Sequence, residues 1–208
     1  AEVIPVSHEQ GGFVGAVEMA NAFAAARDDV FLPRQFDNPM NIEAHELTTG
    51  PEIEQQLRAF DRTPDAFVAG VGTGGTVMGV GRALRRGGRD VRVHPLEPAN
   101  SPTLRAGRCV GHHRIQGISD EFVPAVLDLD EIDRIVDVWD GDAIIMAQRL
   151  SRELGLAVGI SSGGNVIGAM QLVEELGDDA TVITIFPDSN KKYLSLIHIS
   201  EPTRHRRI

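Results

Sequence analysis

The hydrophobic residues of this chain follow two patterns: short continuous apolar runs, and longer stretches with apolar residues three or four positions apart. The continuous runs predict buried strands at residues 1–6, 29–36, 65–71, 91–98, 155–160 and 180–189. The spaced pattern predicts helices at residues 11–27, 50–60, 77–84, 140–154 and 161–176. Apolar strands that alternate with helices are typical of a parallel sheet covered on both faces, so an α/β fold is expected.

Two polar stretches interrupt this alternation. Residues 37–50 are rich in turn-forming and polar side chains and predict a connector. Residues 120–138 carry many acidic side chains and predict a solvated surface. Asp140 and Asp142 flank a glycine at an expected helix start, where acidic residues commonly cap the helix, and His112 and His113 are expected to be solvated in a loop.

Composition narrows the classes of function. The chain has 208 residues, 42% of them hydrophobic and 24% charged, which is ordinary for a globular protein. Its net charge of −10 argues against non-specific binding to nucleic acid or to an anionic membrane. No apolar run approaches the ~20 residues of a membrane span. The single cysteine, Cys109, excludes an internal disulfide and predicts a cytoplasmic protein.

The stretch GVGTGGTVMGVG, residues 70–81, is the most informative part of the sequence, because a glycine-rich turn between a strand and a helix commonly binds phosphate. One hypothesis is a dinucleotide site of an NAD(P)-dependent oxidoreductase. Gly70, Gly72 and Gly75 match G-x-G-x-x-G, and Glu97 at the end of the next strand stands where a ribose-binding acid is expected.

A second hypothesis is a serine hydrolase, because GISSG at residues 159–163 matches the G-x-S-x-G turn. That fold needs a histidine after the serine. Only His198 and His205 follow Ser161, and both lie in a terminal segment that we interpret below as non-native.

A third hypothesis joins both glycine segments into one site, because ligands of parallel sheets bind at the carboxyl ends of the strands. GTGGT at residues 72–76 offers backbone N–H groups and threonine hydroxyls to a phosphate monoester. SSGG at residues 161–164 begins a second helix and can present a hydroxyl group to another atom of the same ligand.

Separated motifs then indicate a family. They are RQFDNPMN, TTGPEI, GVGTGGTVMGVGR, HRIQGI, VGISSGGN and FPDSNKKYLS, in this order along the chain. With this order and spacing the sequence resembles the cysteine synthases (O-acetylserine sulfhydrylases), which are fold-type II pyridoxal-phosphate enzymes with a tryptophan synthase β-like fold. The resemblance extends to Tyr193.

The resemblance implies specific roles. The cofactor would be pyridoxal 5′-phosphate, its phosphate held by Gly72, Thr73, Gly74, Gly75 and Thr76. Ser161 would bind the pyridine nitrogen, although the adjacent Ser162 is not separated from it by sequence. Gln35 and Phe36 would lie at the substrate carboxylate and side-chain pocket, and Gly117 at the active-site entrance. Asp188 would lie near the cofactor without a catalytic role. No metal is implied.

The implied reaction makes L-cysteine from O-acetyl-L-serine and sulfide, and a cystathionine β-synthase-like enzyme is the alternative within the family. The family uses a Schiff-base lysine near its N-terminus. The only lysines here are Lys191 and Lys192, so we expect no catalytic residue in this chain and no activity from it as given. The resemblance implies a homodimer, and serine acetyltransferase is a further candidate partner. Neither nucleic acid nor a membrane is expected as a partner.

The expected organisation has three parts. Residues 1–38 would be the end of a smaller N-terminal α/β domain, and residues 39–193 a larger C-terminal domain that binds the cofactor. Residues 194–208 read LSLIHISEPTRHRRI, which resembles a translated sequencing-library adapter. We therefore expect a fragment that lacks upstream sequence and carries a non-native tail.

Overall fold

The computed structural model describes residues 2–119 and 121–193, and the expected adapter-derived tail lies outside them. A parallel sheet lies at the centre, with strand order β3-β2-β1-β4. The strands are β1 (Ala66–Gly70), β2 (Arg92–Pro98), β3 (Val136–Val138) and β4 (Val182–Ile183). All three strand pairings are parallel, which confirms the α/β class.

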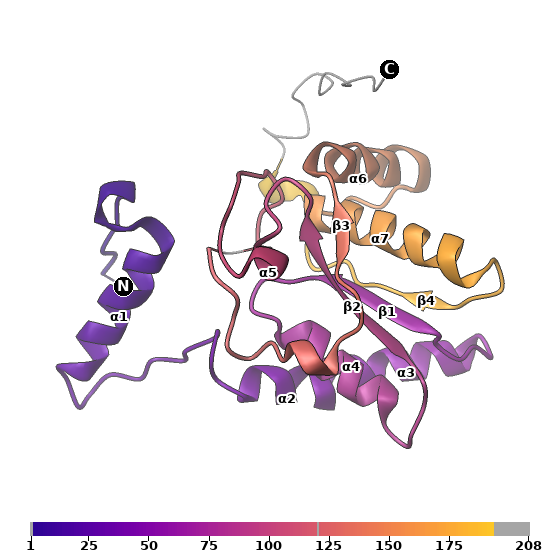
Figure 1. Ribbon diagram of the computed structural model, residues 1–208, viewed down its shortest axis with the longest axis horizontal. Coiled ribbons are helices and arrows are strands. Elements are labelled where there is room, and N and C mark those ends of the chain that lie inside the picture. Colours follow the sequence, from indigo (N-terminus) through magenta and orange to yellow (C-terminus); the bar gives the residue numbers. More distant parts are fainter. Residues whose placement is uncertain (1, 120, 194–208) are drawn as a thin grey trace.

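Helices cover both faces of the sheet (Figure 1). The α-helices are α1 (Gly12–Ala25), α2 (Met40–Leu47), α3 (Thr49–Ala59), α4 (Gly75–Arg85), α5 (Thr103–Ala106), α6 (Asp140–Leu154) and α7 (Ile160–Leu176). Three short 3-10 helices are η1 (His8–Gln10), η2 (Leu129–Glu131) and η3 (Asn190–Lys192). None of the helices in the described ranges combines the length and the apolar character that a membrane span requires.

Alternate residues of β1 divide the core into two layers. Phe67 and Ala69 pack with α4 and α2 in one buried cluster. Ala66 and Val68 pack with α6 and α7 in the other cluster. Because successive side chains of a strand point to opposite faces, β1 is buried on both sides, as its continuous apolar sequence predicts.

The N-terminal segment contrasts with this unit. In Figure 1 the helix α1 stands beside the sheet and its helices, joined to them by an extended segment. Gly15 is the only buried residue of α1, whereas Phe13, Met19 and Phe23 are exposed. The predicted helix at residues 11–27 is confirmed, but it buries little apolar surface within the described residues.

Several predicted elements are wrong. Residues 2–6 and 29–36 contain no strand, because neither segment pairs with another strand in the described part of the chain. Residues 155–160 form only one antiparallel bridge, between Val158 and Ser189, before α7 begins. The run at 180–189 supplies only the two residues of β4 to the edge of the sheet.

The two polar stretches are also corrected. The expected connector at residues 37–50 contains α2 and the start of α3. The expected solvated surface at residues 120–138 contains β3 and the buried Val126 and Leu127, whereas Asp128, Asp130 and Asp133 are exposed.

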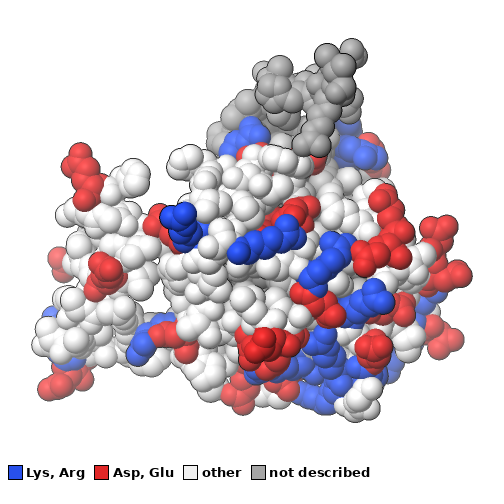
Figure 2. Space-filling view, viewed as in Figure 1, with Lys and Arg blue, Asp and Glu red and all other residues white. Residues whose placement is uncertain are grey.

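Arginine and acidic side chains are interleaved over the sheet unit on the face shown in Figure 2. Four of the arginines on α4 and in the loop after it pair with acids from other segments: Arg82 with Glu131, Arg85 with Asp133, Arg86 with Glu46 and Arg89 with Glu54. These exposed pairs leave little unbalanced positive charge on α4 and contribute little to stability individually.

Candidate functional site

The glycine loop follows β1 and leads directly into α4. Gly74 is the N-cap residue of α4 and has φ +90°, a backbone conformation that glycine adopts without steric cost. Because Gly74 has no side chain, it cannot accept a hydrogen bond from the backbone amides in the first turn of α4 as a capping side chain would. Together with the helix dipole, these amides make the loop suitable for an anion.

Two further glycines of the loop allow close approach of other segments. A Cβ on Gly72 would lie 2.5 Å from the Gly117 carbonyl oxygen. A Cβ on Gly75 would overlap the side-chain amide of Asn41. The structure therefore brings Gly117, predicted at the active-site entrance, against the predicted phosphate loop.

Asn41 joins the loop to the predicted substrate segment. Its Nδ2 donates to the Gln35 carbonyl oxygen and to Thr73 Oγ1, both at 2.8 Å. Thr73 Oγ1 also accepts from the Gly75 amide at 3.3 Å, which leaves the Thr73 hydroxyl proton for another acceptor. Sequence reasoning did not select Asn41, although it closes the RQFDNPMN motif.

His45 holds the other threonine of the loop. Its Nε2 lies 3.1 Å from Thr76 Oγ1, and its Nδ1 lies 2.9 Å from Thr49 Oγ1. Burial lowers the pKa of His45, so the ring is neutral at neutral pH. A neutral ring donates from one nitrogen and accepts at the other, which links the orientations of the two hydroxyl groups.

The second glycine segment opens α7 without a side-chain cap from the N-cap residue Gly159. Ser161 and Ser162 occupy its first turn and differ in accessibility. Ser161 is 7% exposed, whereas Ser162 is 0% exposed and its Oγ has no hydrogen-bond partner among the described residues. Ser161 is therefore the more exposed of the two serines.

Asn165 and Asp188 hold this end of α7. Asn165 Oδ1 accepts from the Gly70 amide at 2.8 Å, so α7 is bonded to the strand end that begins the glycine loop. Asp188 accepts from the Gly159 amide through its backbone oxygen at 3.0 Å. Its Oδ2 accepts from the Tyr193 hydroxyl at 2.5 Å, and burial together with this bond raises the pKa of Tyr193 to about 12.

The segment from Gly117 to Ser119 borders the loop on another side. Its Ser119 amide donates to the Val71 carbonyl oxygen at 2.7 Å, and Ile118 packs on Gly70. Ser119 has φ +55°, which is uncommon for a residue other than glycine. Its hydroxyl lies 3.0 Å from the Ser101 carbonyl oxygen, to which it donates, and 3.0 Å from Thr103 Oγ1. These contacts fix the segment against the glycine loop.

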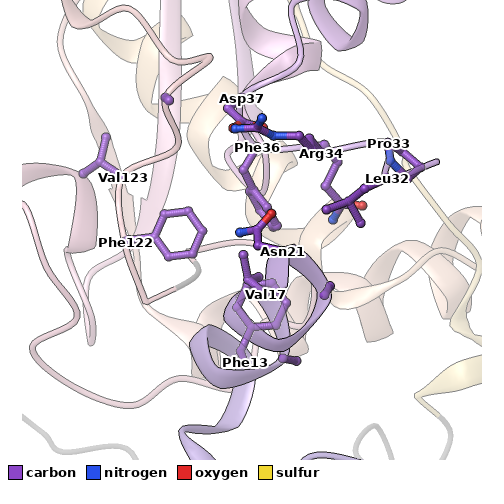
Figure 3. A pocket seen from close by; sticks show the side chains of 14 residues that line it. Phe13, Val17, Asn21, Leu32, Pro33, Arg34, Phe36, Asp37, Phe122 and Val123 are labelled. Carbon is purple, nitrogen blue, oxygen red and sulfur yellow. The ribbon is translucent and has the colours of Figure 1, made fainter. Parts of the chain in front are cut away.

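A hollow of about 480 Å³ is lined by Gln35 and Phe36 and by residues of α1, and Figure 3 shows Phe36 near Phe13 and Val17 of α1. Phe13 and Phe122 also line it. The ring centroid of Phe36 lies 5.5 Å from that of Phe13 and 5.1 Å from that of Phe122, both in edge-to-face arrangements. The hollow is mainly apolar, and Asn41 connects its Gln35 side to the glycine loop.

Other residues singled out from the sequence serve the fold. Glu97 is buried and its Oε2 accepts from the Leu104 amide at 2.7 Å, so this carboxylate is not available to a ribose. The N-cap residue of α6 is Trp139, which makes no side-chain cap bond, and Asp140 is the first residue of the helix. The Asp140 carboxylate binds the Arg114 guanidinium at 2.8 Å, so the predicted capping role is corrected. The described residues contain no cluster suited to a metal ion.

Known proteins resemble this chain closely. A protein family described as "Pyridoxal-phosphate dependent enzyme" matches residues 1–188. A cysteine synthase of Staphylococcus aureus is 44% identical over 165 residues, which cover 79% of this chain and 52% of that protein. The chain thus spans about half the length of this curated relative.

Solved structures extend the similarity to the fold. A hydrogen sulfide-producing enzyme from Fusobacterium nucleatum is 49% identical, with a TM-score of 0.94 over 98% of this chain and 61% of that one. An O-acetylserine dependent cystathionine beta-synthase from Helicobacter pylori is 36% identical, with a TM-score of 0.82 over 93% of this chain and 61% of that one.

Proposed function

The chain belongs to the pyridoxal-phosphate dependent enzyme family, and on that premise we propose that it is the cofactor-binding part of a cysteine synthase. The reaction is the formation of L-cysteine from O-acetyl-L-serine and sulfide. The observation that carries the proposal is the left-handed Gly74 at the start of α4, which provides no side-chain cap to the helix amides and lies beside the Thr73 hydroxyl.

The residues present suit pyridoxal phosphate. A phosphate monoester needs several converging donors, and the first turn of α4 offers backbone amides together with the Thr73 and Thr76 hydroxyls. In the proposed site Gly72, Thr73, Gly74, Gly75 and Thr76 hold the phosphate group. Asn41 and His45 support the proposal because they fix the two threonine side chains.

Ser161 binds the pyridine nitrogen in this proposal. Ser161 is the more exposed residue of the serine pair, and its hydroxyl is electrically neutral. When bound, the cofactor supplies an electron sink for charge that develops on the substrate's α-carbon. A neutral serine at the ring nitrogen keeps that sink weaker than a carboxylate partner would, which favours loss of the β-substituent.

Gln35 and Phe36 receive the amino-acid substrate, and Gly117 lines the path to it. The contact of Gln35 with Asn41 supports this assignment, because Asn41 links the substrate segment to the phosphate loop. The Phe13, Phe36 and Phe122 rings give one side of the hollow an aromatic wall.

We also propose that the 208-residue chain makes no cysteine by itself. Lys191 and Lys192 are its only lysines, and both are exposed in η3. The test has two arms. The purified chain should bind pyridoxine 5′-phosphate in calorimetry and produce no cysteine from O-acetyl-L-serine, sulfide and pyridoxal phosphate. Failure to bind the first compound would contradict the cofactor site, and cysteine formation would contradict the predicted inactivity.

A second candidate function is the release of sulfide from L-cysteine. The F. nucleatum relative is described as producing hydrogen sulfide and is more similar in sequence than the S. aureus cysteine synthase, at 49% against 44% identity. Cysteine formation replaces acetate by sulfide on the β-carbon, whereas sulfide release breaks the β-carbon–sulfur bond and adds water or a second thiol at the same carbon, so one site can serve either. The two functions can be distinguished with an active form of the enzyme. Its rates of cysteine formation and of sulfide release are measured at matched substrate concentrations, and the larger rate assigns the main activity.

The remaining assignments also belong to this proposal. Residues 1–38 are the end of a smaller domain and residues 39–193 the larger cofactor-binding domain. The complete enzyme is a cytoplasmic homodimer, and serine acetyltransferase is a candidate partner. Homocysteine as the nucleophile, which would make the enzyme cystathionine β-synthase-like, is supported by the H. pylori relative.

A further inference from the structure

Asn165 lies in α7 and bonds to the end of β1 and to the segment after β4. Its Oδ1 accepts from the Gly70 amide at 2.8 Å, and its Nδ2 donates to the Ile185 carbonyl oxygen at 2.9 Å. The residue is 1% exposed. Both bonds are made to backbone groups, so the side chain fixes the distance of α7 from β1 and from the segment after β4.

The position of Asn165 on α7 relates it to Ser161. The two residues are four positions apart, and residues with this spacing lie on the same face of a helix. Asn165 therefore lies one turn behind Ser161, on the face turned toward the end of β1. A displacement of α7 along or away from the strand moves the Ser161 hydroxyl by a similar amount.

The glycine loop has separate supports on its other side. Asn41 donates to Thr73, and His45 pairs with Thr76. The Val71 amide donates to the Leu96 carbonyl oxygen at 3.1 Å. None of these contacts involves α7, so residues 71–76 of the loop have supports that are separate from Asn165. What depends on Asn165 is the distance between the loop and Ser161.

We propose that Asn165 is a positioning residue that sets the span between the phosphate-binding loop and the Ser161 hydroxyl, so that one ligand can bind both. This inference rests on the proposed function, because it concerns the same pyridoxal-phosphate site. Asn165 does not touch the ligand in this account. It acts through the Gly70 backbone and the first turn of α7.

Two probes separate this role from a merely structural one. Inorganic phosphate needs only the loop, whereas pyridoxine 5′-phosphate needs the loop and Ser161 at the correct distance. Pyridoxine 5′-phosphate has no aldehyde, so Lys191 and Lys192 cannot trap it as an imine. Calorimetry on the 208-residue chain gives Kd for each probe, and the ratio of the two values is the readout.

Two variants and one control complete the experiment. Asn165→Leu removes both hydrogen bonds, and Asn165→Gln keeps the amide on a side chain that is one methylene longer. Gln171→Leu is the matched control, because Gln171 is also on α7 and donates its amide to the Asp137 carbonyl oxygen at 3.1 Å. Thermal unfolding of each variant reports stability separately from binding.

Both Asn165 variants should weaken pyridoxine 5′-phosphate binding about tenfold or more while phosphate binding stays within about twofold. The Gln171→Leu control should leave the ratio unchanged. An equal loss for both probes, or no loss, in the Asn165 variants would overturn the inference. If Asn165→Leu does not fold, the ratio for Asn165→Gln decides. Failure of the unmodified chain to bind pyridoxine 5′-phosphate overturns the proposed function, and this inference with it.

Discussion

The two glycine-rich helix starts of this protein look alike in sequence and use glycine for different reasons. At the start of α4, Gly74 has a left-handed backbone, and Gly72 and Gly75 let other segments approach the loop. At the start of α7 no glycine from 159 to 164 has a positive φ. There Gly163 removes a side chain where the backbone of α6 passes, so the two helices pack closely.

The comparison shows that glycine content alone does not identify an anion site. The α4 loop begins its helix with no side-chain cap from Gly74, and its glycines serve backbone conformation and the close approach of other segments. At the start of α7, Gly163 allows close packing against α6. The contribution of this segment to a ligand comes from one serine hydroxyl. Substitutions that affect stability and binding differently can test this distinction.

The largest effect is expected for Gly163→Ala. The added Cβ would overlap the Ala143 carbonyl oxygen and lie 2.7 Å from the Ala147 amide nitrogen, both in the backbone of α6. We expect the free energy of unfolding to fall by about 3 kcal/mol, measured by urea denaturation. Gly164→Ala is the control, because its Cβ would lie 3.6 Å from Ala143 Cβ and the change should be neutral or stabilising. Equal losses in the two variants would contradict the packing account.

Gly74→Ala is expected to have the second largest effect. A left-handed backbone costs a residue with a side chain about 1–2 kcal/mol, and here the strain falls on the phosphate loop. Stability and phosphate affinity should therefore fall together. Gly88→Ala has a similar φ of +79° with open space around it, so it should lower stability and leave phosphate binding unchanged. Unchanged phosphate binding in Gly74→Ala would remove the main support for the loop as the anion site.

Ser161→Ala should affect binding more than stability. Loss of the hydroxyl should weaken pyridoxine 5′-phosphate binding about tenfold, or about 1.4 kcal/mol, with phosphate binding unchanged. Ser162→Ala removes a buried hydroxyl that has no partner among the described residues, so neutral or slightly increased stability is expected. The reverse pattern, measured by calorimetry and thermal unfolding, would exchange the roles of the two serines.

The smallest effect concerns pH. Burial lowers the pKa of His45 below the value of about 6.5 that it has in the unfolded chain. The unfolded state then binds more protons, so the free energy of unfolding should decrease as pH falls through about 6.5 and level off below the folded pKa. His45→Gln should reduce this slope without abolishing it, because burial also lowers the pKa of His94. Urea denaturation between pH 8 and pH 5 measures both slopes, and an unchanged slope would contradict the expectation.

Much of the fold could be predicted because local patterns encode it. The periodicity of residues 140–154 and 161–176 gave α6 and α7, and the apolar runs gave β1 and β2. The runs at 1–6 and 29–36 failed because a strand exists only when another strand pairs with it, which a local pattern cannot reveal. Helix α2 was missed because its short polar sequence begins after Pro39 and resembles a turn.

The site was predictable in part for a related reason. The glycines and threonines of residues 72–76 form a contiguous motif that a sequence displays directly. Asn41 and His45 reach the same loop across 32 and 31 positions, and Asn165 meets Gly70 across 95 positions. One sequence gives no indication of which distant polar side chains meet, so these supporting residues required the folded chain.

The single amide of Asn41 has a mechanical consequence. It donates both to the Gln35 backbone and to the Thr73 side chain, so the same side chain is hydrogen-bonded to the substrate segment and to the phosphate loop. A displacement that carries the Gln35 carbonyl oxygen away from Thr73 therefore strains one of these two bonds. The Asn41 amide therefore couples movement of the substrate segment to movement of the phosphate loop.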